Sequence, residues 1–227
     1  MNAIIFSKNR AMQLDCLLRS IYEHCNIFYA VSVIYKTDFK ESYQILKDNY
    51  PAVNWIEEIN FADDLCLEIV VYESNYICLL VDDDIFFRDV DNISLNEMMT
   101  EVDIVSLRLG RNVTKQMHFN YKGSIDGNVY RRKFLLKLFK KGFTNPNKLE
   151  SKLVQMTSDM TMGWFNESKL IGIPANKVSD SSTCSDMGIS VEELDERFLK
   201  GERINYKAMN LESTNVHKNE TYAYFMG

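Results

Sequence analysis

The chain is poor in the residues that interrupt or cross-link a fold. Its 227 residues include only nine glycines and three prolines, and no repeat, low-complexity tract or linker divides them. One domain of this length can bury a sizeable core, so we expect a single unit over residues 1–227. The five cysteines form no C-x-x-C pair, and an odd, unpatterned count suits a reducing compartment.

The sequence also lacks a long apolar segment and an excess of positive charge. Its N-terminus runs straight into Ile4-Ile5-Phe6 without a basic region, so we expect no signal peptide, no membrane span and a cytoplasmic location. The net charge of -6 argues against a nucleic-acid partner. Basic residues do cluster at 131–133 and 137–141, where a solvated helix face is the simpler interpretation.

Apolar runs alternate with helical periodicity through the first half of the chain. The pattern predicts strands at 2–7, 30–35, 53–59 and 76–81, with helices at 14–25, 42–49 and 65–72. This alternation predicts an α/β fold with a parallel, doubly wound sheet. The second half is less regular, with helices expected at 95–102, 131–141 and 190–199 and strands at 103–109 and 169–178.

Three aspartates, Asp82, Asp83 and Asp84, directly follow the fourth predicted strand. Adjacent like charges cost free energy unless a cation or a hydrogen-bonding partner offsets them. A hard divalent cation takes oxygen ligands and often shares them with phosphates. Because residues i and i+2 of a strand point the same way, we expect Asp82 and Asp84 to face one site and Asp83 another. The segments 7–10 and 36–38 end two other strands, so three segments converge on the rim where such sheets bind ligands.

The segment Ala3-Ile4-Ile5-Phe6-Ser7-Lys8-Asn9-Arg10, the helix that follows it and the Asp-x-Asp cluster resemble a GT-A glycosyltransferase. The small GT-A domains of large algal viruses and some bacteria are the most similar group. The resemblance implies a Rossmann-like, mainly parallel sheet flanked by helices. It also implies a nucleotide-sugar-binding half over about 1–90 and an acceptor-binding half over about 91–227. The implied reaction moves a sugar from a nucleotide-diphosphate donor, a UDP-sugar, to a glycan hydroxyl, in the host cytoplasm if the source is viral.

This resemblance further implies a Mn²⁺ or Mg²⁺ site and assigns its ligands. Asp84 would hold the metal, while Asp82 would contact the ribose or the metal through water. Asp83 would lie near the donor sugar or simply in solvent. His217 is a second candidate ligand, although a lone histidine is often only structural. The candidate donor contacts, several with structural alternatives, are Ser7, Arg10, Lys36, Thr37, Asp64 and Lys218.

The catalytic base of an inverting enzyme would be a carboxylate that deprotonates the acceptor hydroxyl. Glu150, in the first turn of a predicted helix, is the first candidate, although the helix dipole explains a glutamate there equally well. Asp126 is the alternative, or binds the donor sugar, and Asp159 is third. A retaining enzyme would need no such base. Trp164 and Phe165 either stack on an acceptor sugar or pack in the core.

Two other functions compete with glycosyl transfer. A sugar-phosphate nucleotidyltransferase has a related sheet, but it usually carries a glycine-rich loop after the first strand, where residues 7–10 contain no glycine. A non-catalytic binding module with the same fold is the other alternative. The intact residues Asp82, Asp84, Glu150 and His217 speak against a decayed site.

Overall fold

The computed structural model describes residues 1–140, 142–177, 188–218, 222 and 225–227. Its central sheet has the strand order β3-β2-β1-β4-β7-β6-β8. The parallel strands of the first half run in the order expected of a doubly wound sheet, and β8 is parallel to β6. Strand β7 lies between β4 and β6 and is antiparallel to both. The α/β fold with a mainly parallel sheet is therefore confirmed. The strands are β1 (Asn2–Lys8), β2 (Ala30–Lys36), β3 (Asn54–Glu57), β4 (Tyr76–Val81), β6 (Ile104–Ser106), β7 (Asn128–Arg131) and β8 (Met162–Trp164).

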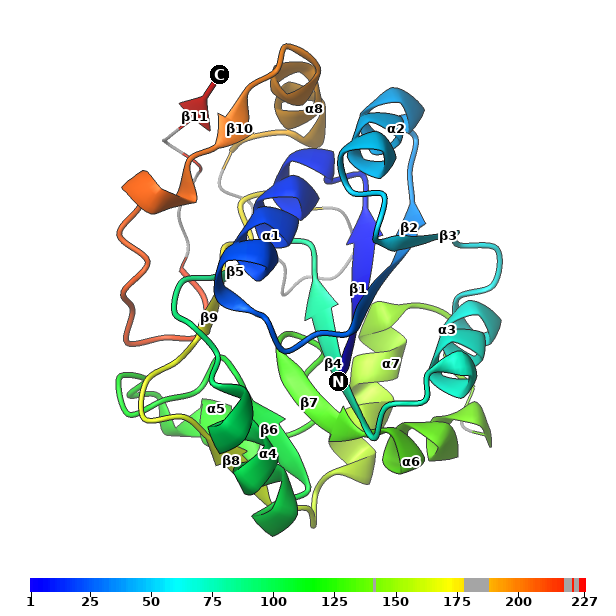
Figure 1. Cartoon of the computed structure of the whole chain (residues 1–227), viewed down its shortest axis with the longest axis vertical. Helices are drawn as coiled ribbons and strands as arrows, with labels where there is room; N and C mark the ends of the chain where they lie inside the picture. The colour runs from blue at the N-terminus through cyan, green and yellow to red at the C-terminus, as the bar shows by residue number, and fades with distance from the viewer. Residues whose placement is uncertain (141, 178–187, 219–221, 223–224) are drawn as a thin grey trace.

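Helices cover both faces of this sheet because its strands are apolar on both sides. Along β1, Ala3 and Ile5 face one core cluster, and Ile4 and Phe6 face the other. Figure 1 shows α1 lying across β1 and β4 on the first face. The helices are α1 (Ala11–His24), α2 (Lys40–Asn49), α3 (Phe61–Val71), α4 (Asn92–Glu101), α5 (Gln116–Asn120), α6 (Arg132–Leu135), α7 (Pro146–Met156) and α8 (Val191–Leu199).

Polar side chains begin several of these helices by accepting hydrogen bonds from free backbone N–H groups. The Ser190 hydroxyl accepts from the Glu193 amide at 3.0 Å at the start of α8. Asn60 is the N-cap of α3, and Asp63 and Asp64 lie in its first turn. The helix predicted over 131–141 is divided into α6 and a 3-10 helix, η1 (Leu136–Lys140).

Two small sheets lie outside the central one. Strand β5 (Asp84–Phe86) pairs antiparallel with β9 (Leu170–Gly172), and β10 (Arg203–Ile204) pairs with β11 (Phe225–Met226). The strands predicted at 103–109 and 169–178 are therefore too long, and residue 178 lies outside the described part. Pairing of β9 with β5 brings the acidic cluster next to a segment almost ninety residues further along the chain.

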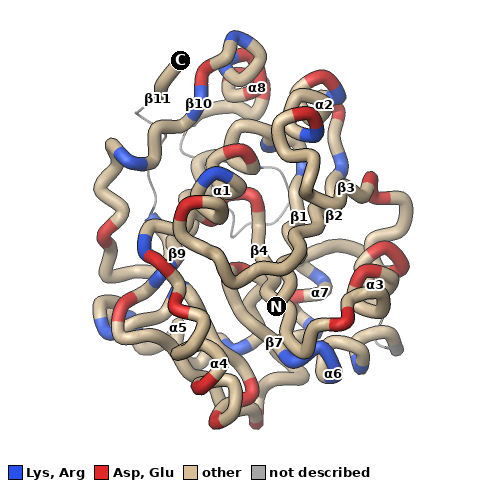
Figure 2. The backbone as a smooth tube through the Cα atoms, viewed as in Figure 1, with Lys and Arg blue, Asp and Glu red and all other residues tan. Residues whose placement is uncertain are grey.

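The basic residues of α6 gather at one end of the molecule (Figure 2). Arg132 donates to the carbonyls of Ile69 and Val70, and Arg131 donates to those of Met99 and Val102. These arginines therefore satisfy carbonyls at the ends of α3 and α4, where a cation also complements the helix dipole. Among the described residues, no helix combines the length and apolarity needed to cross a membrane.

Candidate functional site

The acidic cluster sits in a turn and not in an extended strand. Strand β4 ends at Val81, Asp82 and Asp83 form the turn, and Asp84 begins β5. The expectation that Asp82 and Asp84 face one site while Asp83 faces another is wrong. Alternation of side chains requires an extended backbone, and the turn removes it. Asp82 and Asp83 share one partner, whereas Asp84 points into a separate group of residues.

Asp82 is buried and has protein partners on both carboxylate oxygens. Its Oδ2 accepts from Ser7 Oγ and from the Lys8 amide, each at 3.0 Å. Its Oδ1 accepts from Arg10 Nη1 at 3.0 Å. Burial raises the pKa of Asp82 to about 6 even though the Arg10 charge opposes the shift. Ser7 is in turn held by Tyr43, with 2.6 Å between the two hydroxyl oxygens.

Arg10 ties the acidic turn to a distant loop. Its Nη1 lies 3.0 Å from both Asp82 Oδ1 and Asp83 Oδ2. Its Nε donates to Asn176 Oδ1 at 2.9 Å, and its Nη2 donates to the Asn176 carbonyl. Burial opposes the charge of Arg10, but the two aspartates raise its pKa above the usual value. Each guanidinium nitrogen of Arg10 therefore already has a protein acceptor. This arrangement is not the one in which an arginine holds a phosphate group with two parallel hydrogen bonds.

Asn176 is a site residue that the sequence reasoning missed. It is buried, and its Oδ1 also accepts from Gln13 Nε2 at 3.1 Å. No sequence signal marks it, since it lies 166 positions from Arg10 in an irregular loop.

Asp84 is buried with one oxygen unpartnered. Its Oδ2 accepts from the Val81 amide at 3.0 Å, which stabilises the turn. Among the residues that the structure describes, its Oδ1 has no hydrogen-bond partner. Burial and the nearby charges of Asp126 and Asp83 raise the pKa of Asp84 well above its usual value. A buried, unpartnered carboxylate oxygen is costly, and a cation would remove that cost.

Asp84 and His217 flank a glycine across three neighbouring strand segments. Asp84 is opposite Gly172 in the β5–β9 pair, and Gly172 bridges in parallel to His217. A Cβ atom on Gly172 would lie 2.5 Å from His217 Cδ2, too close for any side chain. The His217 imidazole therefore occupies the space that a side chain at Gly172 would take, and Asp84 is paired with the same glycine.

Asp126 joins this group through its oxygen Oδ2. That atom lies 2.7 Å from Arg108 Nη1 and 3.4 Å from His217 Nε2. Burial raises the pKa of Asp126, but Arg108 and His217 outweigh it, and the net shift is downward. Arg108 is buried and was not among the predicted residues, because it lies just beyond the short strand β6 inside an apolar run.

Glu150 is on α7, and its carboxylate lies near that of Asp126. The helix starts at an Asn145 cap with Pro146 in its first turn. Glu150 Oε1 accepts from the Ile125 amide at 3.4 Å, and the Tyr121 hydroxyl donates to the same carboxylate. Burial, reinforced by Asp126, raises the pKa of Glu150 to about 7. A carboxylate that titrates near neutrality suits proton transfer.

The remaining predicted donor contacts are Lys36, Thr37, Asp64 and Lys218, of which Lys218 follows His217 and donates its amide to the Gly172 carbonyl at 2.9 Å. Lys36 ends β2 at an exposed position, and Thr37 Oγ1 accepts from the Phe39 amide at 2.9 Å. Asp64 Oδ2 accepts from the Ile59 and Asn60 amides at 2.9 and 3.0 Å, so its structural role in the α3 turn is clear. Lys218 Nζ donates to the Asn210 carbonyl.

The three other candidates from the sequence differ in how exposed their side chains are. Asp159 is exposed, three residues before the strand β8. Phe165 is 8% exposed and belongs to the core, whereas Trp164 is 38% exposed at the surface.

The residues around Gly172 fit a hard divalent cation in donor type. They offer the free Asp84 oxygen and the His217 imidazole, with Asp126 beside them. Oxygen ligands suit Mg²⁺ and Mn²⁺, and imidazole suits several transition metals. Within the described residues, however, no three His, Cys, Asp or Glu side chains stand close enough to form a ready-made metal group. Asp82, in particular, is turned away toward Arg10.

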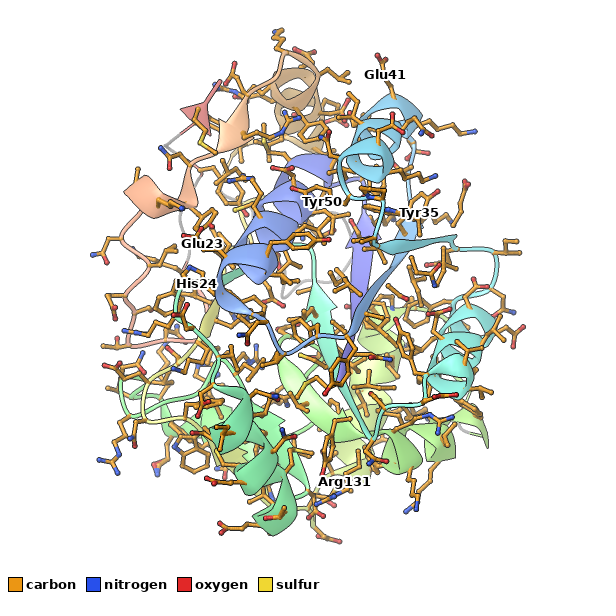
Figure 3. All side chains as sticks on the ribbon, in the orientation of Figure 1. Glu23, His24, Tyr35, Glu41, Tyr50 and Arg131 are labelled. Carbon is orange, nitrogen blue, oxygen red and sulfur yellow. The ribbon has the colours of Figure 1, made fainter. Side chains whose placement is uncertain are left out.

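Two surface cavities lie away from this site. Both are lined by Glu23, Tyr206 and Lys207, at the C-terminal end of α1. Figure 3 shows Glu23 and His24 there, at the end of the helix opposite to Arg10. None of the candidate site residues lines either cavity.

Comparisons with known proteins agree with this architecture. No family model matches the chain. The bifunctional glycosyltransferase pgtA of Dictyostelium discoideum is 31% identical over 121 residues, which are 47% of this chain and 15% of that protein. The solved structure of S. aureus TarS superposes with a TM-score of 0.52 and 10% identity over 75% of this chain and 36% of TarS. A CMP:2-keto-3-deoxy-manno-octonic acid synthetase reaches only 0.45 at 13% identity, over 88% of this chain and 100% of that one.

These matches carry different weight. The TarS likeness supports the fold alone. The chain spans only a small part of pgtA and about a third of TarS. About half of the chain is similar to a segment of a glycosyltransferase, and its fold is similar to that of TarS.

Proposed function

We propose that this chain is a metal-dependent glycosyltransferase domain that transfers a sugar from a UDP-sugar to a glycan hydroxyl, with inversion. The observation that carries the proposal is the pair Asp84 and His217, which lie on the two sides of Gly172 in neighbouring strand segments. The pair lies beyond the carboxyl end of β4, the edge where open α/β sheets bind their ligands. The unpartnered Oδ1 of Asp84 supports a cation there.

The donor would lie along the rim formed by the ends of β1, β2 and β4. Asp82, held by Ser7 and Arg10, is rigid and suits a ribose contact. Asp83 has one oxygen on Arg10 and is the more exposed of the two, which suits contact with the donor sugar. Lys36, Thr37 and Lys218 remain candidates for the nucleotide and its phosphates.

The proposed transfer step forms one bond and breaks another at the anomeric carbon. The acceptor oxygen forms a bond to the anomeric carbon while the bond from that carbon to the phosphate oxygen breaks. The acceptor proton passes to Glu150, and the nucleoside diphosphate leaves with the electron pair. A divalent cation bound by Asp84 and His217 would supply Lewis-acid stabilisation of the diphosphate. Asp126 is the alternative base, but its ion pair with Arg108 lowers its basicity.

Nucleotidyl transfer is less well supported. The loop after β1 has no glycine, and Asn9 takes the left-handed conformation there, with a φ of 56°. Asn9 Nδ2 donates to Asp38 Oδ2 at 2.9 Å, and the Asp38 amide donates to Asn9 Oδ1 at 2.8 Å. These mutual bonds tie the loop after β1 to the loop after β2 through the Asn9 side chain.

Thermal unfolding with UDP, GDP and dTDP, each with and without Mn²⁺, tests the proposal. A ligand at 100 times its Kd should stabilise the fold by roughly 2.7 kcal/mol. We expect a Mn²⁺-dependent shift with UDP that Asp84→Ala abolishes. Glu41→Ala, on the exposed surface of α2, is the control and should keep the shift. Absence of a shift with all three nucleotides would refute the proposal.

A further inference from the structure

A group of large apolar side chains is exposed on α5 and β8, in the second half of the chain. Met117 is 70% exposed, and Tyr121 and Trp164 are each 38% exposed. The ring of Phe119 meets that of Trp164 edge to face, with 4.9 Å between centroids. We call these four residues the aromatic patch, in which the contact between Phe119 and Trp164 joins α5 to β8.

The aromatic patch is connected to both ends of the candidate site. The Tyr121 hydroxyl donates to Glu150, the candidate base. His118, on the same short helix, has its Nε2 2.6 Å from Asn215 Oδ1, two residues before His217. Phe119 also packs against a small cluster that contains Val216. Helix α5 therefore links the candidate base to the segment that carries the candidate metal ligand.

The sequence alone left Trp164 and Phe165 undecided between sugar stacking and core packing. Phe165 is buried, with Lys169 Nζ 5.1 Å from its ring centre. Trp164, on β8, is paired with Ser106, on β6. Ser106 lies two residues before Arg108. The same strand pair thus positions Trp164 and the partner of Asp126.

We propose that the aromatic patch is the acceptor subsite and that it takes a pyranose ring, with Trp164 beneath the apolar C–H face of the sugar. This inference rests on the proposed glycosyl transfer. A pyranose presents a flat C–H face of about the size of an indole. If the acceptor were instead the hydroxyl of a serine or threonine side chain, most of the aromatic patch would stay exposed to solvent. Exposed aromatic rings beside a proton acceptor are the chemistry that positions a sugar hydroxyl for attack.

Tryptophan fluorescence tests binding directly, because the chain has two tryptophans. Trp55→Phe leaves Trp164 as the reporter. The probes are the methyl β-glycosides of glucose, galactose and N-acetylglucosamine and the methyl α-glycosides of mannose and fucose, with UDP and Mn²⁺ present. We expect at least one to change the Trp164 emission saturably. Flat titrations with all five would overturn the inference.

Saturation-transfer NMR with the same glycosides tests the patch by substitution. Loss of one stacked ring should weaken binding about three- to tenfold. Trp164→Ala should show this loss and Trp164→Phe a smaller one. Phe139→Ala, an aromatic residue 37% exposed on η1, is the matched control and should bind normally. Equal binding by Trp164→Ala and the control would overturn the inference.

Donor binding separates this inference from the proposed function. Trp164→Ala should retain the Mn²⁺-dependent thermal shift with UDP and slow hydrolysis of UDP-sugars by water, because neither involves the acceptor. If the shift and hydrolysis persist while glycoside binding ignores Trp164, the acceptor subsite is wrong and the glycosyltransferase proposal stands. If UDP fails to bind the wild-type chain, the proposed function fails first.

Discussion

The imidazole ring of His217 lies directly against the backbone of Gly172. A Cβ atom at Gly172 would meet His217 Cδ2 at 2.5 Å and Nε2 at 3.2 Å. Gly172 is paired on its other side with Asp84. The glycine is thus required for space and not for backbone conformation, since it is not among the glycines with positive φ.

Replacing Gly172 by alanine should displace His217 without unfolding the chain. Overpacking of this kind costs about 1–3 kcal/mol. Loss of a properly placed ligand should weaken Mn²⁺-dependent UDP binding about 10- to 100-fold, measured by calorimetric titration. Gly163→Ala is the control, because its Cβ would touch only Val102 side-chain atoms at 3.2 Å or more. Normal UDP binding by Gly172→Ala would contradict the role given to His217.

Removal of Arg10 should destabilise the fold strongly. Arg10→Ala would leave the buried Asp82 without its cation, which costs on the order of 3–5 kcal/mol in comparable buried pairs. Urea unfolding measures the effect, and Arg10→Lys should be intermediate because it keeps the charge but loses the fork on Asn176. Arg88→Ala removes a more exposed ion pair with Glu212 and should cost about 1 kcal/mol or less. Equal losses for Arg10→Ala and Arg88→Ala would show that Arg10 is not a structural anchor.

Glu150→Gln should separate transfer from donor binding. General-base catalysis contributes about 10²–10⁴-fold, so the transfer rate should fall within that range. The UDP thermal shift should remain, because in the proposed reaction Glu150 contacts the acceptor hydroxyl and not the nucleotide. An unchanged transfer rate would assign the base to Asp126.

The pH dependence of transfer should report the pKa of Glu150. The base acts only when ionised, so the rate should rise with pH and level off above about 7. The negative charge of Asp126 raises this pKa, and the positive charge of Arg108 lowers it. Asp126→Asn should therefore move the rising limb to lower pH, and Arg108→Gln should move it to higher pH. Shifts in the same direction for both variants would exclude Glu150 as the titrating group.

Much of the first half of the fold was predictable because local pattern and tertiary structure agree there. Apolar runs and helical spacing mark β1, α1, β2, α2 and β4, whose contacts are mostly with neighbouring elements. The second half depends on long-range pairing. Strand β9 is three residues long and finds β5 almost ninety positions away, which no local pattern reveals. The position of β7 between β4 and β6 is likewise set by long-range strand pairing and not by local sequence.

The site was predictable in its residue types but not in its geometry. The acidic triplet was visible in the sequence, yet the turn at Asp82 and Asp83 reversed the expected pairing of side chains. Arg10 was a candidate donor contact, and in the structure it neutralises two aspartates. Asn176 was missed because its partner Arg10 is 166 positions away, and Arg108 was missed because it lies inside an apolar run.

Product analysis after incubation with UDP-sugars tests the central claim most directly. Wild-type chain, Mn²⁺ and a panel of UDP-sugars should release UDP and free or transferred sugar. Omission of Mn²⁺ or the Asp84→Ala substitution should abolish this release. Parallel reactions with UTP and sugar 1-phosphates should give no pyrophosphate. Pyrophosphate release from UTP without any UDP release from UDP-sugars would contradict the account and identify nucleotidyl transfer instead.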